Sequence, residues 1–89
     1  MSEEFSIAVT KEEWAIMCNS PFIQQAHGAG FFQAFFDDGE FLLVPTQDVQ
    51  RLSMFLRSHE GKEPVRPLER RFYSAIRAIY NDLSKLKKA

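Results

Sequence analysis

The sequence predicts an α+β fold in which a small antiparallel sheet packs against three to four helices, in the order β-α-(α)-β-β-α-α. Two observations lead to this class. Apolar residues alternate over a short segment near the start of the chain, and two further apolar segments are joined by an Asp-Gly pair, as expected for strands and a hairpin. Elsewhere apolar residues recur at three- and four-residue steps behind capping residues, as amphipathic helices require.

The first strand is expected at about residues 5–10, because Ile7 and Val9 alternate with smaller or polar residues. Thr10 then predicts the start of a helix. As the N-cap it can form a capping box with Glu13, which stands three residues later.

This helix should carry Trp14, Met17 and Cys18 toward the core, where a lone cysteine is usually a small buried hydrophobic residue. An Asn-Ser-Pro sequence then interrupts the helix. Ser20 and Pro21 are placed as the N-cap and first residue of a short second helix.

Residues 31–44 have the pattern of a β-hairpin. Asp38-Gly39 indicates a two-residue type I′ turn, which needs positive φ at both positions. This turn places successive residues on two faces. One face holds Phe32, Ala34, Phe36, Phe41 and Leu43, and the other holds Phe31, Gln33, Phe35, Leu42 and Val44. Neither face is polar, although a small antiparallel sheet commonly shows one polar face to water.

Two further helices are expected in the second half of the chain. Thr46 is placed as the N-cap of the first, Gly61 as its natural stop, and residues 60–67 as a polar connector that contains two prolines. Pro67 suits the first position of the last helix. The apolar seam of that helix is Leu68, Phe72, Ile76, Ile79, Leu83 and Leu86. We expect residues 1–89 to form a single domain.

The two apolar faces of the hairpin predict an interaction surface. Two or three helices can cover one face of a three-stranded sheet, but covering both is difficult. An apolar patch of this size left in water would promote aggregation, so burial by a second copy or by another protein is expected. The chosen partner interface is Phe31, Gln33, Phe35, Leu42 and Val44. Covering of that face by the chain's own helices is the alternative.

Charge is unevenly distributed along the chain. Residues 1–45 carry one Lys and seven acids, a net of −6, whereas residues 46–89 carry ten basic and five acidic residues, a net of +5. Candidate contacts to an anion or a partner are Arg66, Arg70, Arg71 and Arg77. The first three gather at the start of the last helix, where the macrodipole disfavours positive charge and where free N–H groups and guanidinium groups can bind an anion. Pairing with internal acids, such as Glu63, Glu69 or those of the hairpin turn, explains them equally well. Arg77 falls on a basic row typical of a solvated helix face.

The chain contains no recognisable catalytic or cofactor motif. The acids of the hairpin are explained by the turn itself, and Cys18, His27 and His59 do not fall at a zinc-ligand spacing. There is no nucleophile elbow, phosphate loop or His-Glu-x-x-His sequence. We therefore expect no catalytic residue, no metal site, no cofactor and no enzymatic activity.

These observations favour a small protein–protein interaction module, such as an adaptor, inhibitor or immunity-type factor, that docks an aromatic sheet face. Its partner would be a second copy, giving a homodimer, or another protein of unknown identity, and a phage or mobile element could encode it. The alternative is a nucleic-acid-associated regulator that uses the basic C-terminal half. The net charge of −1 disfavours this alternative, because DNA-binding domains are usually distinctly basic.

A cytoplasmic location is expected. The first residues include acids where a signal peptide needs basic residues, and no apolar run approaches the ~18 residues of a membrane span. The single cysteine suits a reducing compartment, and no membrane contact is expected.

Overall fold

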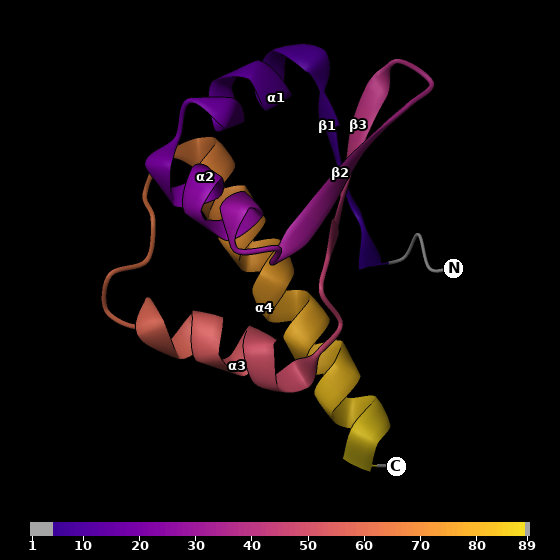
Figure 1. Ribbon diagram of the computed structural model, residues 1–89. Helices are drawn as coiled ribbons and strands as arrows, with labels where there is room; N and C mark the ends of the chain where they lie inside the picture. The colour runs from indigo at the N-terminus through magenta and orange to yellow at the C-terminus, as the bar shows by residue number, and fades with distance from the viewer. Residues whose placement is uncertain (1–4, 89) are drawn as a thin grey trace. The chain divides into compact units, whose positions relative to one another are not determined.

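The computed structural model describes residues 5–88 and confirms the α+β class, with a three-stranded antiparallel sheet and four helices (Figure 1). The elements are β1 (Ile7–Thr10), α1 (Lys11–Cys18), α2 (Pro21–Gly28), β2 (Phe32–Asp37), β3 (Glu40–Pro45), α3 (Val49–Ser58) and α4 (Pro67–Lys88). The chain divides into two compact units, Met1–Pro45 and Thr46–Ala89. The division precedes the connector at residues 60–67, and cooperative unfolding as a single domain stays a prediction.

The hairpin of the first unit has the predicted turn and register. Asp38 and Gly39 have φ values of 52° and 80°, both positive as a type I′ turn requires. Phe36 pairs with Phe41, and Phe35 pairs with Leu42. The strand order is β1-β3-β2, so β3 is the central strand and β2 lies at an edge.

The predicted caps position the two helices of this unit. Thr10 Oγ1 accepts the N–H of Glu13 at 3.1 Å, and Glu13 Oε1 accepts the N–H of Thr10 at 2.9 Å, which completes the capping box of α1. Ser20 Oγ accepts the N–H of Ile23 at 3.3 Å at the start of α2, where Pro21 is the first helical residue.

Helices α1 and α2 lie on one side of the sheet (Figure 1). The ring of Trp14 stacks on Phe41 with centroids 5.4 Å apart and meets Phe32 edge-on at 6.4 Å. From α2, the ring of His27 stacks on Phe32 at 5.0 Å. One of the two apolar hairpin faces is therefore covered by helices of its own unit. The buried apolar residues of this unit include Ile7, Val9, Met17, Ile23, Ala26, Phe31, Phe32 and Leu43.

The expected burial of Cys18 is wrong, because this residue is exposed at the end of α1. The helix has only eight residues, and Met17 occupies the inward position at its end. Successive side chains on a helix point about 100° apart, so Cys18 turns away from the position that Met17 fills.

In the second unit, α3 begins two residues later than predicted. Its N-cap is Asp48, whose Oδ1 accepts the N–H of Gln50 at 3.0 Å. Thr46, the predicted cap, accepts the N–H of Asp48 at 3.2 Å and so closes a turn before the helix. Both residue types favour helix starts, and the carboxylate nearer the helix takes the role.

Helix α4 packs against α3 through aromatic rings. Phe55 meets Phe72 edge-on at 6.4 Å and Tyr73 at 6.1 Å, and the hydroxyl of Tyr73 donates to the carbonyl of Leu56 at 3.2 Å. Pro67 is the first residue of α4, as predicted. Along the predicted seam, the buried residues are Phe72, Ile76 and Ile79, the half-buried ones are Leu68 and Leu83, and Leu86 is exposed.

Candidate protein-interaction face

The sheet face opposite α1 and α2 presents apolar side chains to solvent. Its hairpin residues are Gln33, Phe35, Leu42 and Val44, a set that we call the open face. Phe35 retains 50 % of its accessible surface and Gln33 is exposed, while Leu42 and Val44, on the central strand, are half-buried. The open face thus combines one exposed aromatic ring with two partly exposed aliphatic side chains.

The register of the hairpin makes this face continuous. Phe35 lies directly opposite Leu42, and Gln33 lies directly opposite Val44. Residues that face each other across antiparallel strands have Cβ atoms roughly 5 Å apart, so their side chains touch. On β1, which pairs with the other edge of β3, the exposed Ala8 lies opposite Leu42. Leu42 therefore has no bulky neighbour on β1.

Phe31 does not belong to the open face, although the strand alternation places it there. It lies before β2, is only 5 % exposed, and donates its N–H to the carbonyl of Ala26 at 2.9 Å. Gly30 has a φ of 74° and turns the chain just before this residue, so strand geometry begins only at Phe32. Four of the five predicted interface residues are brought together, and the fifth is buried.

Phe36 is an exposed aromatic residue that the sequence did not single out. It retains 56 % of its accessible surface although it belongs to the face that α1 and α2 cover. Its ring meets Phe41 at 5.1 Å, and Lys11 Nζ lies 5.3 Å from its centroid. The available signal was its position beside the Asp-Asp-Gly turn, since the tip of a hairpin is the part that short helices cover least.

Arg77 has a partner within the second unit. Its Nη2 lies 3.9 Å from Glu63 Oε2, and its Cζ lies 5.2 Å from the ring centroid of Tyr73. The pKa of Glu63 lies below its ordinary value of 4.5, because its carboxylate is hydrogen-bonded by its own N–H and by that of Gly61, with Arg77 adding a smaller effect. This arginine therefore links α4 to the connector through an exposed ion pair.

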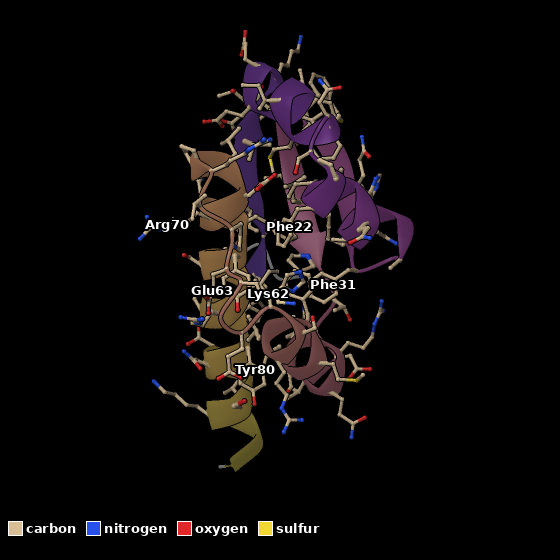
Figure 2. All side chains as sticks on the ribbon, turned by 90° about the vertical axis from the view of Figure 1, so that its left-hand side faces the viewer. Phe22, Phe31, Lys62, Glu63, Arg70 and Tyr80 are labelled. Carbon is tan, nitrogen blue, oxygen red and sulfur yellow. The ribbon has the colours of Figure 1, made fainter. Side chains whose placement is uncertain are left out.

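The other three arginines have different surroundings. Arg71 interacts with other groups of the chain. Arg66 and Arg70 are exposed one helical turn apart, and within residues 5–88 neither side chain has an ion pair or a hydrogen bond. Figure 2 shows Arg70 extending away from α4. Of the four predicted arginines, Arg71 and Arg77 thus interact with other groups of the chain, whereas Arg66 and Arg70 are exposed to solvent.

The part of the chain that the structure describes contains neither a metal site nor a membrane-spanning helix. In that part, no group of three or more His, Cys, Asp and Glu side chains could hold a metal ion. None of its helices combines the length and apolar character that crossing a bilayer requires. No protein-family model matches the chain, and neither does any curated protein or solved structure.

Proposed function

We propose that the protein is a small protein–protein interaction module that binds its partner through the open face. The observation that carries this proposal is the exposure of Phe35 beside two half-buried aliphatic residues, Leu42 and Val44. Complete burial of a Phe side chain is worth about 1.5–3 kcal/mol, and roughly half of this ring is still available to a partner.

The grouping of these residues distinguishes the open face from other exposed apolar residues. Ile16 on α1 and Met54 on α3 are 62 % and 68 % exposed, but each is an isolated side chain on a helix. Single exposed apolar residues are ordinary in folded proteins, whereas contiguous ones that include an aromatic ring are typical of binding surfaces.

The charge of the hairpin favours a protein partner over a nucleic acid. Its turn carries Asp37, Asp38 and Glu40, and residues 31–45 contain no Lys or Arg. A phosphate backbone would be repelled by this surface, because nucleic-acid binding depends on basic side chains that replace counterions. An apolar protein surface has no such requirement.

Site-specific photocross-linking tests the proposal. A benzophenone amino acid replaces Phe35 in one protein and Ile16 in a control, since both positions are exposed and apolar but only the first lies on the open face. We expect irradiation in the native host to give a discrete adduct from position 35, identified by mass spectrometry, and no comparable adduct from position 16.

A second substitution makes the readout specific for the open face. Leu42→Lys places a charge beside position 35 and should remove the adduct, because burying an unpaired ammonium in an apolar contact is strongly unfavourable. Circular dichroism checks that this variant remains folded. Equal labelling at both positions, or an adduct that survives in folded Leu42→Lys protein, would contradict the proposed function.

A further inference from the structure

The outer edge of β2 has a pattern of backbone groups available for pairing. Because the turn has two residues, Asp37 and Glu40 form a hydrogen-bonded pair. Hydrogen-bonded and non-hydrogen-bonded pairs then alternate along the hairpin. Phe35 therefore bonds to β3, whereas the N–H and C=O groups of Ala34 and Phe36 point away from it. Within residues 5–88 no strand pairs with β2 on that outer side.

Nothing in the sequence of β2 blocks this edge. Natural edge strands commonly carry a lysine, a proline or a bulge that prevents pairing with another chain. The six residues Phe32–Asp37 contain no lysine and no proline, and their pairing with β3 is continuous. Their single charge is Asp37, at the end of the strand.

We infer that β2 pairs antiparallel with β2 of a second copy of this chain, with Phe35 of the two copies facing each other across a two-fold axis. This inference rests on the proposed function, because it makes the open face continuous across the two copies, and it adds the identity of the partner and the register. In this register Ala34 of each copy exchanges backbone hydrogen bonds with Phe36 of the other, so the outward groups described above are satisfied.

The side chains are self-complementary in the same register. On the open face, the two Phe35 rings meet at a non-hydrogen-bonded pair, where side chains approach most closely. Gln33 of each copy lies opposite Asp37 of the other, so the amide can donate to the carboxylate. On the opposite face, the large Phe36 lies over the small Ala34. The Phe35–Phe35, Gln33–Asp37 and Phe36–Ala34 pairs are therefore each complementary.

The charges of the hairpin also permit this arrangement. The two Asp37 residues lie four residues apart along the strand direction, about 13 Å at roughly 3.3 Å per residue. This separation exceeds the Debye length of about 8 Å at physiological salt, so their repulsion is largely screened. A parallel pairing in equal register would instead place Asp37 beside Asp37.

The neighbouring antiparallel register fits less well. Centring the pair on Ala34 would require the backbone of Phe32, a residue that is only 2 % exposed. It would also place the polar Gln33 opposite the aromatic Phe35. The accessible backbone groups and the side-chain chemistry therefore favour the register centred on Phe35 over the one centred on Ala34.

Disulfide cross-linking tests the register. In a Cys18→Ser background, which removes the chain's exposed thiol, Phe35→Cys should form an intermolecular disulfide on mild oxidation. The two Cα atoms would lie about 4.5 Å apart, within disulfide range. The matched control is Phe36→Cys, a site of similar exposure. Its two copies would lie on the other face and about 8 Å apart, beyond that range. Equal yields, or a disulfide only from position 36, would overturn the register.

Ala34→Pro tests the edge separately from the open face. This substitution removes an outward N–H, and proline is tolerated in edge strands at such positions. By light scattering, wild type should have twice the mass of the chain, and Ala34→Pro should weaken dimerisation at least about tenfold while circular dichroism is unchanged. If the proline variant is misfolded, the cross-linking result decides.

The outcomes separate this inference from the proposed function. A wild-type protein that stays monomeric at all concentrations overturns the inference, as does a dimer that is insensitive to a folded Ala34→Pro substitution. In either case an adduct from position 35 to a different protein, lost in Leu42→Lys, still supports the interaction module. An adduct to a second copy supports the proposed function, and it supports the inference as well only if folded Ala34→Pro removes it.

Discussion

The guanidinium of Arg77 lies over the ring of Tyr73, with its Cζ 5.2 Å from the ring centroid, and reaches Glu63 with its Nη2 at 3.9 Å from Oε2. Tyr73 donates its hydroxyl to the carbonyl of Leu56 at 3.2 Å, near the end of α3. The three contacts Tyr73–Leu56, Tyr73–Arg77 and Arg77–Glu63 therefore connect α3, α4 and the polar connector. This arrangement makes the stability of the second unit depend on Glu63 and Tyr73.

Glu63 should make stability depend on pH in the acid range. Its folded-state pKa lies below its ordinary value of 4.5, so the folded chain binds its proton less tightly than the unfolded chain does. The stabilising effect is present above about pH 4.5 and is lost as the pH falls through the lower, folded-state pKa. We expect thermal melts of wild type and Glu63→Gln to differ most near neutral pH and to converge in acid.

The control for this prediction is Glu60→Gln, which removes a nearby exposed acid of the same connector. A constant difference between wild type and Glu63→Gln at all pH values would show that the substitution acts through side-chain shape rather than through the charge.

Tyr73→Phe should destabilise the protein by about 1 kcal/mol, because it leaves the carbonyl of Leu56 without the hydroxyl donor while keeping the aromatic packing. Tyr73 is buried. The matched control is Tyr80→Phe, since Tyr80 is half-buried and its hydroxyl has no hydrogen bond within residues 5–88. Urea denaturation of the three proteins measures the difference, and equal midpoints for both variants would contradict a role for the Tyr73 hydroxyl.

Ile76→Ala should cost about 2–5 kcal/mol, the usual range for removing a fully buried aliphatic side chain. Ile76 has no exposed surface, whereas Leu86 on the same helix is largely exposed. We therefore expect Leu86→Ala to change stability by less than about 0.5 kcal/mol. If the two variants unfold at the same denaturant concentration, the seam of α4 does not contribute as a buried core.

Local chemistry explains what could be predicted of the first unit. Asp38-Gly39 determined the turn, and the turn determined the register of the hairpin. Thr10 and Glu13 determined the start of α1. These features depend on residues only a few positions apart, so the sequence contains all the information that they need.

Features that depend on distant or competing groups could not be predicted in this way. Both faces of the hairpin are apolar, so nothing in the alternation indicates which one α1 and α2 cover. Thr46 and Asp48 are both good N-caps, and the residue types alone do not indicate which of the two caps α3. Phe31 continues the alternation, but the positive φ of Gly30 takes it out of the strand.

Phe35→Glu should give a soluble monomer under conditions in which wild type self-associates. The substitution places a carboxylate where two rings would meet, and two such charges facing each other repel. The control is Ile16→Glu, which removes another exposed apolar residue, from α1. Light scattering over a concentration series measures the masses. A shift of similar size in both variants would indicate a general effect of added charge.

The last prediction concerns Arg66 and Arg70, two exposed residues that carry positive charge at the start of α4. The positive end of the helix dipole lies at this end, so each charge is unfavourable by a few tenths of a kcal/mol. Replacing both by Glu should therefore raise the free energy of unfolding by about 0.5–1 kcal/mol. The same replacement should weaken any retention on heparin, because guanidinium groups are strong ligands for anionic oxygens.

Melts and heparin elution should be compared with Arg51→Glu, a charge reversal at an exposed site on α3. The two readouts distinguish a binding role from a structural one. Higher stability with earlier elution supports an anion or partner contact that is maintained at a cost to the fold. Lower stability would show that these arginines pair with groups of the chain, and unchanged elution would remove them from the candidate site.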